Sequence, residues 1–180
     1  MFSTITSMDF AFLDFIQNNI RCVFLDFVMP IITAVGNGGI VWVILGIVFM
    51  SFKKYRKCGA AILMGMILCL VLGNVILKPL IARPRPCFIN PNVELLIKMP
   101  KDFSFPSGHT YSAFAAAFII LLCRHRRIGI FVLVLSALIA FSRMYLYVHF
   151  PTDILGGIVL AALVAVASYN ISRAVFSQIE

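Results

Sequence analysis

The stretch AAILMGMILCLVLGNVIL, residues 60–77, contains no charged side chain and is the clearest membrane-spanning helix in the sequence. At about 1.5 Å per residue it would extend about 27 Å, close to the ~30 Å hydrocarbon layer of a bilayer. In that layer a helix pairs its own backbone groups, whereas an open strand leaves them unsatisfied. Comparable apolar runs predict further helices at 39–52, 109–123, 128–147 and 154–171. The sequence therefore predicts an all-α, polytopic membrane helix bundle.

Composition points to the same class of protein. Of the 180 residues, 62% are hydrophobic and 12% are charged, against about 25% charged in soluble proteins. These values exclude a soluble globular domain and a disordered chain. The net charge of +8 is typical of basic loops that orient a membrane protein, so we expect a bilayer and no nucleic acid as partner. The five cysteines form no pair or cluster with ligand spacing, and we expect no metal and no cofactor.

About six spans are expected in a single domain comprising residues 1–180. The first, residues 22–36, is interrupted by Asp26 and Pro30, and a GNGG turn follows it at once. Residues 8–19 place Phe12, Phe15 and Ile16 together at helical spacing, with acidic and amide side chains elsewhere. They predict a helix that lies in the membrane interface.

The basic connections predict how the bundle is oriented. Lysines and arginines crowd residues 53–57 and 124–127, which fall on the same side of alternating helices. That side is expected to be cytoplasmic. With six spans, both termini are then cytoplasmic, and the connections 78–108 and 143–153 are extracytoplasmic.

The first polar cluster follows the long apolar run, in KPLIARPRP at residues 78–86. Basic residues at a helix end often only extend toward lipid headgroups. Here the prolines stiffen the chain and limit the directions of Lys78 and Arg85. Cations held in this way suit a phosphate group, which arginine can bind through two parallel hydrogen bonds.

The second cluster is SFPSGHT, residues 104–110, at the start of a predicted helix. Ser107 and Gly108 could simply cap that helix. The free backbone N–H groups of a helix start also bind anions, and Gly108 would let an oxyanion approach closely. His109 would then stand beside the anion, placed to donate a proton.

The third cluster is SRMYLYVHFPTD, residues 142–153. His149 and Asp153 are four residues apart, so one helical turn could place the carboxylate against the imidazole and raise the pKa of the histidine. A structural hydrogen bond at the interface is the alternative. All three clusters fall on one side of the membrane, which favours a shared site over independent helix caps.

The three clusters match three signatures in order. Six residues lie between Lys78 and Arg85-Pro86, and the PSGH motif occupies residues 106–109. Five residues lie between Ser142-Arg143 and His149, and three lie between His149 and Asp153. This pattern resembles the type 2 phosphatidic acid phosphatase superfamily, which also includes vanadium haloperoxidases. The resemblance covers residues 78–153.

The resemblance implies a metal-independent phosphatase with three catalytic residues. His149 would attack phosphorus to form a phosphohistidine, Asp153 would hold and polarise that histidine, and His109 would protonate the leaving oxygen. The phosphoryl oxygens would be bound by Lys78, Arg85, Ser107, Gly108 and Arg143. Such preorganised donors stabilise the charge on a transferring phosphoryl group.

Other charged residues near these motifs are expected to have ordinary roles. Arg83 lies outside the motif positions and is expected to contact headgroups or the loop. Four loop residues are expected to form a solvated face: Glu94, Lys98, Lys101 and Asp102. Headgroup choice is expected to depend on the loop at 87–103.

Several functions stay open at this point. The leading hypothesis is a lipid phosphatase that acts on a lipid phosphate or pyrophosphate. Undecaprenyl pyrophosphate is the favoured substrate, and phosphatidylglycerophosphate and phosphatidic acid are the alternatives. Transfer of the phosphoryl group to a lipid or sugar hydroxyl is a second enzymatic hypothesis. A transporter or structural membrane protein is the non-enzymatic one, although transport usually needs ionisable groups near the midplane.

Overall fold

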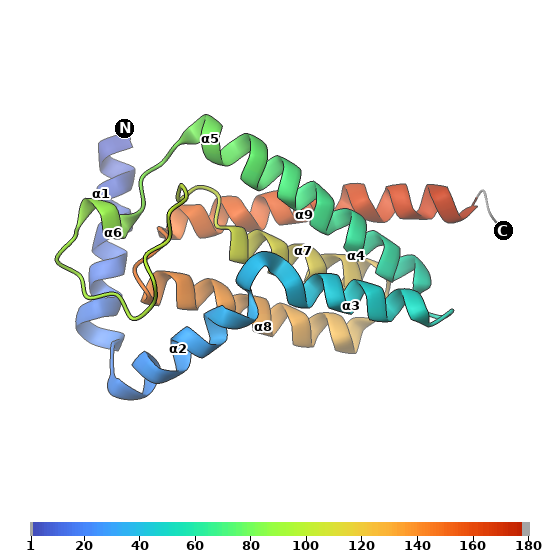
Figure 1. The fold of residues 1–180 in the computed structure, drawn as a ribbon, viewed down its shortest axis with the longest axis horizontal. Helices are drawn as coiled ribbons and strands as arrows, with labels where there is room; N and C mark the ends of the chain where they lie inside the picture. Colours follow the sequence, from blue (N-terminus) through green and yellow to red (C-terminus); the bar gives the residue numbers. More distant parts are fainter. Residues whose placement is uncertain (1, 178–180) are drawn as a thin grey trace.

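The structure is a computed structural model that describes residues 2–177, and over this range it contains helices and loops but no strand (Figure 1). The helices are α1 (Phe2–Phe15), α2 (Val23–Val35), α3 (Ile40–Ser51), α4 (Arg56–Leu68), α5 (Lys78–Ile81), α6 (Pro86–Ile89), α7 (Gly108–Leu122), α8 (Arg126–Tyr145) and α9 (Pro151–Ser177). Widened π-helical turns, Ile16–Ile20 and Cys69–Leu77, follow α1 and α4, and a short 3-10 turn, Asn37–Gly39, joins α2 to α3. The predicted all-α class is confirmed.

The long helices lie side by side, and α1 runs across one end of the bundle (Figure 1). Helix α7 lies at the centre of the bundle, where it packs against α8 and α9 and also contacts α4. Its small side chains at 113 and 115–117 are fully buried, which lets the neighbouring helices approach closely. Large apolar side chains on the outside of the bundle are exposed, among them Phe27 and Phe131. An outer surface of this kind suits lipid rather than water.

Four helical segments are long and apolar enough to cross a membrane, among the residues that the structure describes. They are Val23–Ser51, Arg56–Ile89, Arg126–Tyr145 and Pro151–Ser177, and Gly108–Leu122 is a shorter apolar helix. A multi-pass helical membrane protein is therefore confirmed, but the count of six spans is not. The two spans predicted at 22–36 and 39–52 instead form one broken rod, Val23–Ser51.

A glycine turn explains the broken rod. Gly38 and Gly39 have φ angles of 61° and 68°, a left-handed conformation that costs other residues about 1 kcal/mol or more. The turn bends the chain without reversing it, so α3 continues along the bundle in the general direction of α2 (Figure 1). The described parts of α1 and α9 end at opposite ends of the bundle (Figure 1). The cytoplasmic location of both termini stays a prediction.

Helix α1 has the two faces expected of an interfacial helix. Ile5, Met8, Phe12 and Phe15 are exposed on one face, whereas Leu13 is fully buried on the other. Ile16, which was predicted to share the apolar face, is buried instead against the bundle. Polar side chains of this segment contact the connections at the same end, since Asp14 accepts a hydrogen bond from Tyr147 and Gln17 donates to the Tyr145 carbonyl.

The π-helical turn Cys69–Leu77 carries the chain past α7. Tyr111 donates a hydrogen bond to the Cys69 carbonyl at 2.8 Å. Its ring packs so closely on Gly73 that a Cβ there would lie 2.3 Å from the ring and its hydroxyl. This contact fixes the approach of the helix that ends in Lys78 to the start of α7.

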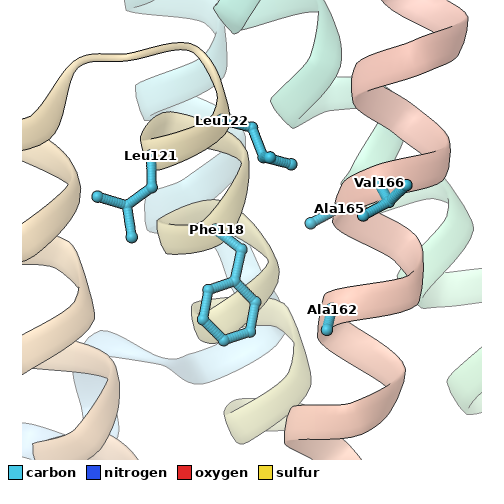
Figure 2. Close-up of a pocket in the computed structure, with 6 residues that line it drawn as sticks. All are labelled: Phe118, Leu121, Leu122, Ala162, Ala165 and Val166. Atoms are coloured by element: carbon cyan, nitrogen blue, oxygen red, sulfur yellow. The ribbon is translucent and has the colours of Figure 1, made fainter.

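An apolar groove lies between α7 and α9, which are otherwise packed together, away from the polar end of the bundle. Figure 2 shows the residues that line it, Phe118, Leu121 and Leu122 on α7 and Ala162, Ala165 and Val166 on α9; Leu122 points toward α9 and Leu121 away from it. The groove has a volume of about 370 Å³. No charged or polar side chain lines it, so its walls offer only packing surface to a hydrocarbon chain.

Candidate active site

Six of the eight predicted site residues surround one cavity of about 550 Å³. They are Lys78, Arg85, Gly108, His109, Arg143 and His149. The other two, Ser107 and Asp153, are fully buried. A backbone hydrogen bond joins them, in which the Ser107 N–H donates to the Asp153 carbonyl at 3.3 Å. The ends of α5, α7, α8 and α9 thus bring together residues that are up to 75 positions apart in the chain.

His149 lies in the tight turn between α8 and α9 and is 1% exposed. Its Nε2 atom is 2.9 Å from Nη1 of Arg85. Since a guanidinium only donates, Nε2 accepts this bond and the proton of the neutral ring is on Nδ1. The unprotonated ring nitrogen is therefore Nε2, which lies beside the phosphate-binding cations.

Asp153 approaches Nδ1 of His149, but a serine hydroxyl stands beside the pair. The distance from Asp153 Oδ2 to Nδ1 is 3.6 Å. Ser104 Oγ is 3.4 Å from Nδ1 and donates to Asp153 Oδ2 at 2.5 Å. The direct contact predicted from the four-residue spacing is thus looser than a hydrogen bond, and Ser104 is a site residue that the sequence reasoning missed.

Arg83 holds the other side of Asp153. Its Nη1 donates to Asp153 Oδ1 at 2.6 Å, and its Nη2 donates to Asp9 on α1 at 2.7 Å. Asp9 also accepts hydrogen bonds from the backbone and hydroxyl of Thr152. The predicted loop contact is made by the backbone alone, since the Arg83 carbonyl accepts a hydrogen bond from the Ser104 N–H. The side chain pairs with Asp153 and Asp9 instead. Its partners lie far away in sequence, so no local pattern marked them.

Two of the three predicted phosphate-binding cations, Arg85 and Arg143, donate hydrogen bonds to uncharged oxygen atoms. Arg85 donates to the carbonyl of Val148 at 2.7 Å. Arg143 is 4% exposed and donates to Thr33 on α2 at 2.6 Å. Its buried Nε has no hydrogen-bond partner among the described residues. A buried donor of this kind is costly unless an acceptor arrives, and an anion in the cavity would supply one.

Helix α7 begins at Gly108, and His109 follows in its first turn. Its Nε2 lies 2.9 Å from Oδ1 of Asn37 in the glycine turn between α2 and α3. Gly36 allows this approach, because a Cβ there would lie 2.8 Å from the His109 ring. Thr33 and Asn37 therefore add polar groups to the site from a segment that carried no motif.

Asp102 occupies the cationic side of the cavity. Its carboxylate pairs with Lys78 and with Arg85, the latter at 2.7 Å. Lys98 and Lys101 also line the cavity. Glu94, Lys98 and Lys101 are exposed, as a solvated face requires. Asp102 is the exception, because it pairs with two cations of the site. The loop folds back over the site, which a charge pattern alone does not reveal.

The charge state of His149 also differs from expectation. Burial lowers the pKa of His149 well below its usual value, and the positive charges of Arg85, Arg143 and Lys78 lower it further. The predicted rise caused by Asp153 is wrong, because the carboxylate bonds to Arg83, Ser104 and the Phe150 N–H instead. His149 is consequently a neutral, buried imidazole at physiological pH.

Comparison with known sequences agrees with this geometry. A sequence profile of the PAP2 superfamily matches residues 58–177, which carry all eight predicted site residues. The chain belongs to the PAP2 superfamily. The superfamily match begins in α4, so α1, α2 and α3, with Asp9, Thr33 and Asn37, lie before it.

Individual PAP2 relatives carry lipid phosphatase names. An undecaprenyl-diphosphatase from Sulfolobus acidocaldarius is 33% identical over 132 residues, 73% of this chain and 63% of that protein. Phosphatidylglycerophosphatase B from Bacillus subtilis is 34% identical over 159 residues, 80% of this chain and 73% of that protein. The chain thus spans less than two thirds of the length of the first of these.

The fold is that of a solved PAP2 enzyme. The crystal structure of the transmembrane PAP2 type phosphatidylglycerolphosphate phosphatase from Bacillus subtilis has a TM-score of 0.67 and 27% sequence identity to this chain. The match covers 99% of this chain and 96% of that one. It therefore includes α1, α2 and α3, which the superfamily profile does not reach.

Proposed function

We propose that this protein is an integral membrane lipid phosphatase that hydrolyses a lipid diphosphate, with undecaprenyl diphosphate as the substrate, through a phosphohistidine on His149. The observation that carries this proposal is the neutral His149 ring, whose Nε2 lies beside Arg85 at the cavity that Lys78 and Arg143 also line. A neutral nucleophile surrounded by fixed cations suits attack on an anionic phosphoryl group.

In the first step, Nε2 of His149 attacks the terminal phosphorus, and the bond from phosphorus to the bridging oxygen breaks. His109 donates a proton to that oxygen as the lipid phosphate leaves. The charge that develops on the imidazole is stabilised by Asp153, directly and through Ser104. Lys78, Arg85 and Arg143 hold the phosphoryl oxygens throughout.

In the second step, a water molecule attacks the phosphorus of the phosphohistidine. His109 accepts a proton from this water, the bond between phosphorus and nitrogen breaks, and inorganic phosphate leaves. Resolution by a lipid or sugar hydroxyl in place of water would make the enzyme a phosphotransferase. Analysis of products separates these outcomes, since a transferase releases little free phosphate.

Lys98 and Lys101 support a substrate with a second phosphate. They line the same cavity as the three cations that would hold the reacting phosphate. A second anionic group close to the first would meet these lysines at the cavity wall. Phosphatidylglycerophosphate also carries two phosphates, and the structural match to the Bacillus subtilis enzyme favours it as the second candidate. Phosphatidic acid has one phosphate and would leave the two lysines unused.

The orientation of the bundle supports action at the extracytoplasmic face. The connections at 53–57 and 124–127, rich in lysine and arginine, lie at the end of the bundle away from the cavity (Figure 1). Short basic connections are typical of the cytoplasmic side. The cavity then opens to the outside, at the depth where a lipid headgroup lies.

Phosphate release by the detergent-purified protein tests this function. Undecaprenyl diphosphate, phosphatidylglycerophosphate and phosphatidic acid are offered in parallel with EDTA present. We expect release from the diphosphate that EDTA does not affect and that His149→Ala abolishes. The double variant K98Q/K101Q is expected to raise KM more for undecaprenyl diphosphate than for phosphatidic acid. Activity that survives in His149→Ala would contradict the mechanism, and equal KM changes would contradict the role of the lysines.

A further inference from the structure

The carboxylate of Asp102 already occupies part of the site that an incoming phosphate would use. Its Oδ1 accepts a hydrogen bond from Nη2 of Arg85 at 2.7 Å, and its Oδ2 pairs with Nζ of Lys78. Both cations line the cavity beside His149. A carboxylate and a phosphate monoester present the same kind of acceptor oxygens to such a pair, so the two anions compete for the same donors.

The surroundings of Asp102 allow its side chain to leave. The Asp102 side chain is 52% exposed, whereas those of Arg85 and Lys78 are 3% and 10% exposed. The carboxylate therefore approaches the buried cations from the open side of the cavity. Its backbone carbonyl separately accepts a hydrogen bond from Nε of Arg85 at 2.8 Å. A rotation of the side chain could break the ion pairs while this backbone contact keeps the loop in place.

We propose that Asp102 is an internal counterion, which holds Lys78 and Arg85 in the free protein and is displaced by the phosphoryl group of the substrate. This inference rests on the proposed function for its substrate, but its geometry concerns any phosphate in the cavity. A carboxylate that returns to the cations weakens the binding of inorganic phosphate and promotes release of the product. Asp102 thus sets the affinity of the site for phosphate.

The ionisation of Asp102 agrees with this role. Burial favours its neutral form, but the hydrogen bond from Lys78 and the positive charge of Arg85 outweigh burial and hold the pKa well below its usual value. The side chain is consequently charged throughout the pH range of an ordinary assay. Asp102 therefore competes with phosphate over this whole pH range, and its own titration does not switch the competition on or off.

Asp102→Asn tests the proposal, because it removes the charge and keeps the size and the backbone contact. Glu94→Gln is the matched control: it removes the same charge from the same loop, at an exposed residue that does not line the cavity. We measure the inhibition constant of inorganic phosphate, the KM for the lipid, and the rise in Tm that phosphate produces in each purified protein. Asp102→Ala is the second variant, should the asparagine variant fold poorly.

The expected result is an inhibition constant for phosphate that falls about fivefold in Asp102→Asn, the effect of one partly exposed charge pair. KM is expected to fall with it, the rise in Tm with phosphate to grow, and Glu94→Gln to behave as the wild type. A weaker or unchanged affinity for phosphate in both Asp102 variants would overturn the proposal, since Asp102 would then merely position the cations or be irrelevant.

The Tm measurement needs no turnover. If no lipid is hydrolysed but phosphate still stabilises Asp102→Asn more than the wild type, the proposed function fails and the counterion proposal stands.

Discussion

Replacing Arg83 with methionine is expected to weaken both the fold and the reaction. The Arg83 guanidinium joins two carboxylates, Asp153 behind the nucleophile and Asp9 on α1, at 2.6 and 2.7 Å. Asp153 is fully buried and Asp9 is 3% exposed, so neither can turn to water if the arginine is lost. Methionine fills a similar volume but leaves two buried negative charges facing each other.

The size of the effect follows from this burial. Removing one partner of a buried ion pair costs about 3–5 kcal/mol, because the remaining charge is uncompensated. For a chain of 180 residues, each kcal/mol lowers Tm by about 2–4 °C, so we expect Arg83→Met to lower Tm by about 10 °C. The orientation of Asp153 is lost as well, and kcat is expected to fall by about 10- to 100-fold, the range for partners that orient a functional histidine.

A double-mutant cycle with Asp9 separates this explanation from a general disruption. Asp9→Asn removes one of the two carboxylates, so the double variant D9N/R83M has one buried negative charge fewer than Arg83→Met. Part of the lost Tm is therefore expected to return in the double variant. Thermal unfolding and steady-state hydrolysis of a lipid phosphate measure the two effects. A wild-type Tm and kcat in Arg83→Met, or additive losses in the double variant, would refute the reasoning.

Three further predictions concern other parts of the site. Ser104→Ala removes the hydroxyl that donates to Asp153 at 2.5 Å, and steady-state kinetics should show kcat about tenfold lower with little change in KM; an unchanged kcat would contradict the role of the hydroxyl. Gly108→Ala places a methyl group 3.9 Å from Nζ of Lys78, where the phosphate would bind. KM should therefore rise while Tm stays near that of the wild type. A lower Tm without a change in KM would argue against this. Because the pKa of His149 is lowered from 6.5 by burial and by nearby cations, its neutral form persists as pH falls, and the acidic limb of kcat/KM should lie below pH 6.5. Unfolded protein binds this proton more readily than the native state, so the wild type should lose stability below pH 6.5 more steeply than His149→Asn, and parallel Tm profiles would contradict the buried neutral histidine.

The sequence alone could predict the cavity because its residues follow the alternation of the helices. Long apolar runs indicate crossings, and each crossing returns the chain to the opposite side. Lys78, His109 and His149 all stand where apolar runs begin or end, so they meet at one end of the bundle. This argument depends only on whether an odd or even number of helices lies between two clusters. The number of spans before Lys78 does not affect it.

The positions of the supporting residues could not be predicted in the same way. Arg83, Asp102 and Asn37 contact the site through loops, whose paths have no periodicity to read. The partners of Arg83 are 70 and 74 positions away in sequence. The sequence predicts two spans where the structure has the broken rod Val23–Ser51, because a glycine turn that reverses the chain and one that only bends it look alike in sequence.

The most direct test of the central claim is to trap the phosphoenzyme. Purified protein is mixed with undecaprenyl diphosphate labelled in the terminal phosphate, quenched in base within milliseconds, and mapped by peptide analysis. The account predicts a label on His149 that is stable in base, labile in acid and absent from His149→Ala. A label on another residue, or phosphate release from the wild type with no label on His149 at any time, would contradict it.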